Sequence, residues 1–234
     1  MNIDDESLSL PDEFAVAEDG IDITTQQEYI AYTAALDSKN YSSEAIDGKV
    51  QRLFSPDASR EEKKEMLALL AHTGRVTSIK IIEQFLEKGD PELRDWARLS
   101  LQECQLFIDD IWSGDKGMGM VMSGLGGENN RLRYFLAVRS RLKTPYTSMD
   151  GTIITENFVE ICRRYNSILE DIQIQSTYVT LKVLVPVDVA VGMVIEDGIS
   201  QCNRKKKLFD ENYYVTNVTI PTEVELQAFL KPVE

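Results

Sequence analysis

The sequence predicts an α+β protein in two parts, with helices first and a mixed region of strands and helices after them. Two observations lead to this class. Apolar residues recur at the spacing of a helix face from about residue 24 to 112, and after residue 117 segments of period two alternate with segments of helical period. The chain has 234 residues, of which 43% are hydrophobic, and this is enough for a sizeable core.

Composition restricts the class further. The net charge is -14, and residues 1–50 alone hold twelve Asp and Glu against two Lys. Residues 1–23 are acidic and poor in large apolar groups, which predicts a flexible or loosely docked arm. Such a segment repels nucleic acid, and it either attracts a basic protein surface or serves solubility alone.

Targeting signals and metal-binding motifs are not found in the sequence. There is no apolar run of 18 residues and no signal pattern at the N-terminus, so we expect a cytoplasmic protein without a membrane span. The three cysteines, Cys104, Cys162 and Cys202, are far apart and fit a reducing compartment. No Cys or His cluster indicates zinc, and no cofactor is expected.

The first part is expected to contain five helices. Capping residues mark their starts: Thr24 or Thr25, Ser42 or Ser43, Ser59, and the pair Asp90 and Pro91. Glycines after the third and fourth helices favour their ends. The expected helices cover about residues 24–36, 43–53, 60–72, 76–87 and 90–111.

The segment DPELRDWARLSLQEC, which opens the fifth helix, resembles the first helix of a HEAT-type repeat. The positions that carry the resemblance are Asp90, Pro91, Leu93, Arg94, Ala97 and Leu101. Together with the two preceding helices it covers about residues 58–107, which is at most one and a half repeats. The resemblance implies stacked helical hairpins that present a surface to other proteins, with neighbouring structure covering their ends.

The second part is read as strands and helices in alternation. A hairpin is expected over residues 117–140, followed by a helix at about 154–169 and two strands at 171–177 and 178–186. Asp188 is expected to cap the next helix, and residues 213–220 to form the last strand. Thr222 and Glu225 form a capping box for a short C-terminal helix.

The order after the first strand of the hairpin is βαββαβ, the ferredoxin-like arrangement of an antiparallel sheet with two helices on one face. The extra strand, at residues 117–123, is expected at the sheet edge. The expected domains are an acidic arm at 1–23, a HEAT-like region at 24–112, a ferredoxin-like domain at 117–220, and a capping helix and tail at 221–234.

Residues 117–140 begin GMGMVMSGLGGENN, and this glycine-rich stretch is the first candidate for chemistry. A phosphate cradle needs a strand, a glycine turn and then a helix N-terminus. Here Gly124, Gly126 and Gly127 precede a strand instead, so we interpret them as turn residues.

Catalytic motifs are also missing. The single histidine, His72, is expected near the backbone carbonyls at a helix C-terminus. Cys162 and Cys202 fall on inward helix faces, and the Ser123 segment MSGLG does not match a nucleophile elbow. No catalytic, cofactor-binding or metal-binding residue is therefore predicted, and the sequence favours a non-enzyme. A site assembled from distant residues stays open.

An arginine-bearing face is the candidate interaction surface. Alternate residues of the strand at 131–140 are apolar and are expected to meet the two helices, whereas the other parity carries the arginines. The neighbouring strand adds an aromatic and a basic residue. The candidate residues are Arg131, Arg133, Phe135, Arg139, Arg141, Tyr178 and Lys182.

These observations favour a non-catalytic interaction or adaptor protein that binds a protein partner through the helices and the arginine-bearing face. Self-association through the sheet is a further expectation. Two alternatives stay open: an RNA-binding or ribosome-associated protein that uses the same face, and a ligand-sensing or enzymatic α+β domain. The run RKKK at 204–207 is interpreted as a solvated loop.

Overall fold

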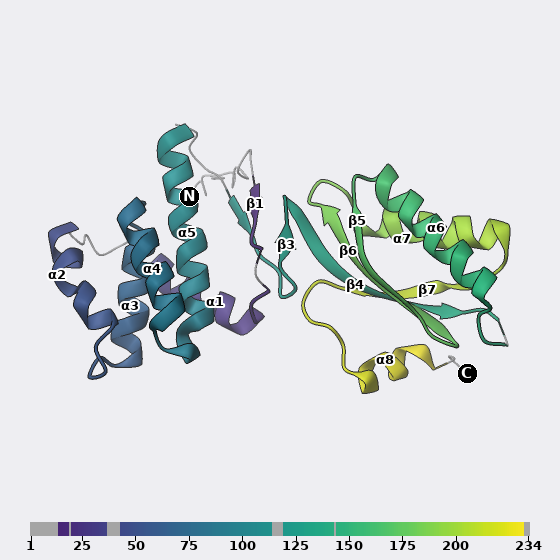
Figure 1. Cartoon of the computed structure of the whole chain (residues 1–234), viewed down its shortest axis with the longest axis horizontal. Coiled ribbons are helices and arrows are strands. Elements are labelled where there is room, and N and C mark those ends of the chain that lie inside the picture. Colours follow the sequence, from purple (N-terminus) through teal and green to yellow (C-terminus); the bar gives the residue numbers. More distant parts are fainter. Residues whose placement is uncertain (1–13, 19, 37–42, 114–118, 143, 232–234) are drawn as a thin grey trace, which may run out of the picture. The chain divides into compact units, whose positions relative to one another are not determined.

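The computed structural model describes residues 14–18, 20–36, 43–113, 119–142 and 144–231. The chain forms two compact units (Figure 1). Unit 1 comprises Met1–Ala17 and Ile21–Met122, and unit 2 comprises Glu18–Gly20 and Ser123–Glu234. The predicted arm up to residue 13 and residues 114–117 of the predicted SGDKG turn lie outside the described residues.

The predicted helices of unit 1 are confirmed in number and place within the described residues. Ser59 caps its helix through a capping box, in which its hydroxyl accepts from the Glu62 N–H while the Glu62 carboxylate accepts from the Ser59 N–H. Asp90 caps a short 3₁₀ turn, Pro91–Leu93, that leads into the last helix. The helices are α1 (Ile23–Leu36), α2 (Ser43–Leu53), α3 (Arg60–Ala71), α4 (Val76–Lys88) and α5 (Arg94–Ser113).

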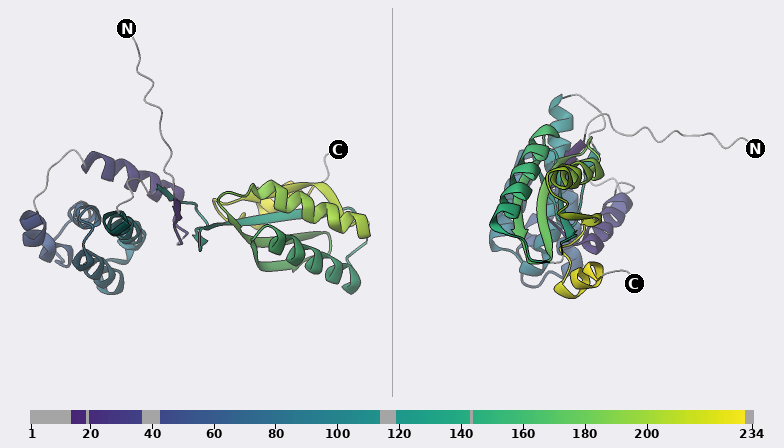
Figure 2. Two further views of the ribbon diagram at one scale, coloured as in Figure 1. Left: turned by 90° about the horizontal axis from the view of Figure 1, so that it is seen from above. Right: turned by 90° about the vertical axis from the view of Figure 1, so that its right-hand side faces the viewer.

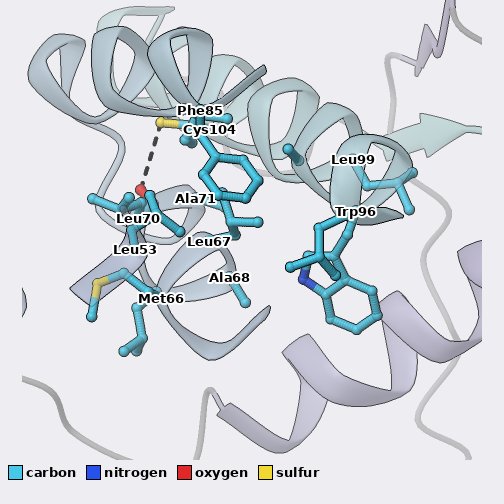
Figure 3. Close-up of a cluster of buried hydrophobic side chains, with 14 of the residues drawn as sticks. Leu53, Met66, Leu67, Ala68, Leu70, Ala71, Phe85, Trp96, Leu99 and Cys104 are labelled. Atoms are coloured by element: carbon cyan, nitrogen blue, oxygen red, sulfur yellow. Dashed lines mark hydrogen bonds between the residues drawn. The ribbon is translucent and has the colours of Figure 1, made fainter. Parts of the chain in front are cut away.

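The core of unit 1 lies between α3, α4 and α5 (Figure 3). Trp96 is almost fully buried, and the rings of Tyr29 and Tyr32 meet it edge-on at 5.1 and 5.5 Å between centroids. The Lys64 ammonium lies 4.4 Å from the centre of the same indole. The aromatic residues of α1 therefore pack on α5 near its first turns.

The HEAT-type resemblance is wrong. In a repeat array each helical hairpin contacts only its neighbours, but α5 packs against α1, α3 and α4 together. Apolar residues of the motif, Leu93 and Ala97, are buried because α5 is the central helix of an irregular cluster. The motif indicates only the start of an amphipathic helix, a feature that many helical folds share.

A short parallel pair of strands also belongs to unit 1. β1 (Phe14–Val16) lies in the segment predicted as a flexible arm, and it pairs with β2 (Gly119–Val121). The predicted hairpin between residues 117–123 and the next strand is therefore wrong. Period two indicates a strand but does not identify its partner, and here the partner lies about 100 residues earlier in the chain.

Unit 2 is an antiparallel sheet with helices. Its elements follow the predicted order βαββαβ, preceded by a two-residue strand, β3 (Gly127–Glu128). The strand order is β5-β6-β4, and the far edge of β4 pairs with β3 at its start and with β7 along the rest. The elements are β4 (Arg131–Ser140), α6 (Ser148–Arg164), β5 (Ile168–Ile174), β6 (Tyr178–Pro186), α7 (Val191–Lys205), β7 (Phe209–Thr216) and α8 (Glu223–Leu230).

The sheet is covered on both faces. α6 and α7 lie side by side on one face, and α8 lies on the other (Figures 1 and 2). Leu136 and Val138 of β4 point into the core with α6 and α7, as predicted from their parity. Phe135 and Ala137 have the opposite parity, and they are buried with Leu226 of α8. The predicted open face is thus partly closed by the C-terminal helix.

Several element ends differ from the prediction. α6 ends at Arg164, because Asn166 takes a left-handed conformation with φ of 51° and the chain turns into β5. Ile168 and Leu169 therefore belong to a strand. α7 is preceded by Ala190, which makes no side-chain cap bond, so Asp188 is not its cap. The predicted Thr222–Glu225 capping box of α8 is confirmed.

The glycine stretch forms a turn, as predicted, and leads into β3 and the Asn129–Asn130 turn. Gly124 is required there for close packing, since a Cβ on it would lie 1.7 Å from the carbonyl oxygen of Val218. None of the helices in the described part of the chain is both long enough and apolar enough to cross a membrane.

Candidate functional site

Three arginines of the predicted face are held by partners within unit 2. Arg133 makes a bidentate pair with Glu170 at 2.6 and 2.8 Å, and Arg131 donates to the backbone and side-chain oxygens of Asn166. Arg139 pairs with Asp210, and it also donates to the Lys231 carbonyl at 3.1 Å. These side chains fasten strand to strand and sheet to C-terminal segment, so their donors are engaged.

The other candidate residues differ in burial, since some are packed under α8 and others are accessible to solvent. Phe135 is buried, and Tyr178 packs against the same small cluster under α8. Lys182 is half-buried, whereas Arg141 is exposed at the end of β4. The structure therefore does not bring the seven predicted residues together as one open basic surface.

A different basic surface is found where α7 ends. Arg204, Lys205, Lys206 and Lys207 are all exposed there. Arg141 is adjacent, because its backbone N–H donates to the Leu208 carbonyl at 2.9 Å. We call these five residues the basic end. Within the described part of the chain, Lys206 is its one member with an ion-pair partner.

Two polar contacts hold the basic end in place. The Lys206 ammonium lies 2.6 Å from a carboxylate oxygen of Asp150, which is 1% exposed at the start of α6. The Asn203 amide both donates to the Phe209 carbonyl at 3.1 Å and accepts from the Phe209 N–H at 2.9 Å. These contacts hold the backbone of the turn between α7 and β7 on both sides. The exposed side chains Arg204, Lys205 and Lys207 therefore extend from a rigid backbone.

Electrostatics around Asp150 follow from these contacts. The hydrogen bond from Lys206, with further bonds from the Thr147 N–H and hydroxyl, lowers the pKa of Asp150 to about 2 against the opposing effect of burial. Asp150 therefore stays ionised at neutral pH, and it neutralises one of the five cations of the basic end.

The residues considered for catalysis have structural positions. Cys162 and Cys202 are buried as predicted, and burial raises the pKa of their thiols to about 11 and about 12. His72 is the C-cap of α3, and its Nε2 lies 3.2 Å from a Glu103 carboxylate oxygen. No group of three or more His, Cys, Asp or Glu side chains suited to a metal ion occurs among the described residues.

A groove of about 520 Å³ runs between α7 and β7 and reaches the basic end. Its wall contains Ile199 and Tyr213, two carboxylates, Glu196 and Glu211, and Arg204 at one end. The Tyr213 hydroxyl donates to Glu196 at 3.0 Å. Burial raises the pKa of Tyr213, and this hydrogen bond raises it further. The groove therefore offers an aromatic ring, hydrogen-bond acceptors and one cation.

Comparison with known proteins is limited to solved structures. No family model and no curated protein matches the chain. A putative transposase from Deinococcus radiodurans R1 is 13% identical, over 44% of this chain and 92% of that chain, with a TM-score of 0.39. A REP-associated tyrosine transposase bound to a REP hairpin is 9% identical, over 42% of this chain and 62% of that chain, with a TM-score of 0.34.

Neither of these structures supports the adaptor hypothesis. One similar structure is of a putative transposase, and the other is of a tyrosine transposase bound to a REP hairpin. The predictions of a non-enzyme, of a protein partner in preference to nucleic acid, and of a helical-repeat interaction protein find no counterpart in these structures and are not kept. Of the sequence-based hypotheses, the two alternatives, an RNA-binding or ribosome-associated protein and a ligand-sensing or enzymatic α+β domain, agree with them better than the adaptor hypothesis does.

Sequence reasoning missed both the basic end and the groove. The run RKKK was interpreted as a solvated loop, although Arg204 and Lys205 belong to the last turn of α7. The four consecutive cations, Arg204–Lys207, were the one sequence feature that indicated the basic end. Nothing in the sequence indicated that Arg141 would lie beside them. The groove has no local signal, because its residues come from two elements whose packing the sequence does not specify.

Proposed function

We propose that unit 2 is a ferredoxin-like domain that binds nucleic acid by contacting the sugar–phosphate backbone with its basic end. The observation that carries this proposal is the set of four exposed cations, Arg141, Arg204, Lys205 and Lys207, without an ion-pair partner in the described chain. Their rigid base reduces the entropy lost when the side chains engage phosphates.

The distribution of charge supports the same proposal. Residues 1–122 contain 12 Lys and Arg against 25 Asp and Glu, whereas residues 123–234 contain 13 against 14. The acidity that argued against nucleic acid in the sequence thus belongs to unit 1. Within unit 2 the sheet residues Arg133 and Arg139 are paired with carboxylates and Arg131 donates to Asn166, whereas four cations without an ion-pair partner in the described chain lie together at the basic end.

The test is binding of the full-length chain to a fluorescently labelled DNA hairpin with a single-stranded tail, a probe chosen because one similar structure holds a REP hairpin. Lys205→Glu with Lys207→Glu should weaken binding at least about tenfold at 100 mM salt, since phosphate contacts are lost. The sheet variant Arg133→Gln should weaken it less.

The matched control is Lys80→Glu with Lys88→Glu. Both lysines are exposed on α4 of unit 1, and neither has an ion-pair partner among the described residues, so the net charge changes equally. Equal loss of binding in the two double variants would mean that total charge, not the basic end, controls binding. Tight binding that survives Lys205→Glu with Lys207→Glu would place the contact elsewhere.

A further inference from the structure

We infer that the α7–β7 groove binds an unpaired nucleobase with an exocyclic amino group, and that it discriminates such bases from thymine and uracil. This inference rests on the proposed nucleic-acid function and adds the part of the ligand that is recognised. The groove volume of about 520 Å³ lies in the range of small-ligand sites and accommodates a single nucleotide.

The mixture of charges in the groove indicates this class of ligand. Arg204 stands where the groove meets the basic end, and Glu196 and Glu211 lie in the same groove. A ligand that matches must carry both an anion and N–H donors. A nucleotide with an amino-bearing base has this pattern, with its phosphate on Arg204 and its amino group on a carboxylate.

The acceptors of the groove are free to receive such donors. One oxygen of Glu196 accepts from the Tyr213 hydroxyl, which leaves the second oxygen for a ligand. The Glu211 side chain is exposed and makes no hydrogen bond or ion pair within the described part of the chain. Ionised carboxylates only accept, so each needs an N–H or O–H from the ligand.

This requirement separates the bases. Cytosine presents an N4 amino donor where thymine presents the O4 acceptor. The thymine oxygen placed against Glu196 or Glu211 would face a second acceptor without a proton between them, and the one donor of that edge, N3–H, is flanked by two carbonyl oxygens that a carboxylate repels. Tyr213 adds an aromatic ring, the kind of side chain on which unpaired bases stack.

A basic peptide fits the groove less well. Its lysines or arginines would satisfy Glu196 and Glu211, but they would have to approach past Arg204 and the adjacent exposed cations of the basic end. The positive charges of such a peptide and of the basic end would repel each other. The mixture of cation and carboxylates thus favours a nucleotide, which carries a negative and a donor end.

The experiment measures the affinity of the full-length chain for labelled dC12 and dT12 at pH 7.5 by fluorescence anisotropy. Wild type should bind dC12 about fivefold or more tightly, the discrimination expected of one good base contact. Glu196→Gln and Glu211→Gln should each bring the ratio towards one, because a glutamine amide both donates and accepts. Glu87→Gln on α4 is the control of equal charge change, and it should keep the wild-type ratio.

The two proposals fail in different ways. Lys205→Glu with Lys207→Glu should weaken dC12 and dT12 binding by the same factor and leave their ratio unchanged, and if it does not weaken either, the basic end is not the backbone contact. A wild-type ratio near one, or a ratio that both groove glutamines leave unaltered, overturns base recognition in the groove.

A second measurement tests the groove when no oligonucleotide binds. Titration with dCMP and with dTMP, followed by amide NMR shifts, should move signals of Ser200 and Tyr213 with dCMP more than with dTMP. Shifts there with a lysine-containing peptide and none with dCMP would assign the groove to a peptide ligand instead, and so contradict the inference.

Discussion

At the scale of the residue, the neighbours of a charged side chain decide what it does. Arg133 and Arg204 are both arginines of unit 2, but Arg133 is bound by Glu170 and Arg204 faces solvent. Lys206 combines the two cases, since it belongs to the exposed residues Arg204–Lys207 and also forms an ion pair with the buried Asp150. A sequence pattern counts charges, whereas binding depends on those without an internal partner.

Asp150 is the residue on which the basic end depends most directly, and Asp150→Asn is expected to destabilise the protein by about 2 kcal/mol at pH 7, the value of a charged hydrogen bond that is lost. Its pKa in the folded state, about 2, is below that of the unfolded chain. The stabilisation is therefore complete above about pH 4 and is lost as the pH falls towards 2.

Urea unfolding of wild type and Asp150→Asn over this pH range measures the effect. The difference in unfolding free energy should be constant between pH 5 and 7 and should shrink between pH 4 and 2. Glu223→Gln, at an exposed position in the first turn of α8, is the control and should show no comparable change. A difference independent of pH would mean that the Asp150 charge does not contribute.

At the scale of the element, contacts between helices determine where the site residues lie. α7 carries Glu196 and Arg204 into the groove because its opposite side packs on α6 and the sheet. Gly198 lies at the contact with α6, where a Cβ would come within 2.4 Å of Phe158. Phe158 is 2% exposed and meets the Phe209 ring edge-on, so it has little room to move.

Gly198→Ala is therefore expected to destabilise unit 2, although alanine favours a helix over glycine by about 1 kcal/mol. Overpacking of a filled core costs typically about 1–3 kcal/mol, so steric conflict should exceed the gain in helix propensity. Chemical denaturation gives the result directly. Gly48→Ala in α2, where a Cβ meets nothing within 4 Å, should be stabilising instead. Stabilisation by Gly198→Ala would show that α6 and α7 separate easily.

The elements themselves were largely predictable. Ser59 was identified as a cap because a serine directly precedes the helical pattern, and Thr222 because its partner Glu225 lies within the same helical turn. The end of α6 was missed because Ile168 and Leu169 continue the apolar helical pattern past Asn166. The partner of β2 was missed because strand pairing across 100 residues leaves no local signal.

At the scale of the whole molecule, charge is divided between the two units. Residues 1–122 account for -13 of the net charge of -14, and residues 123–234 are close to neutral. If the basic end contacts phosphates, the affinity for nucleic acid should therefore decrease with salt concentration, although the whole chain is acidic. The predicted domain boundaries near residues 24, 117 and 221 stay predictions.

The salt dependence is expected to report four phosphate contacts. For a single strand, the slope of log K against log salt is about -0.7 for each contact, so the wild-type slope should be about -3. Lys205→Glu with Lys207→Glu should reduce it to about -1.5. Anisotropy titrations between 50 and 300 mM NaCl give both slopes. A wild-type slope near zero would exclude binding through the phosphate backbone.

The sequence by itself determined the five helices of unit 1, the caps Ser59, Asp90 and Thr222, the order βαββαβ and which alternate residues of β4 face α6 and α7, because these depend on residues within one or two turns of each other. Only the tertiary structure decided which arginines are paired, that α8 covers Phe135, and that Arg141 lies beside Arg204–Lys207. It also decided that α5 is central rather than part of a repeat. Each of these depends on contacts between residues far apart in the chain, for which a single sequence has no periodic signal.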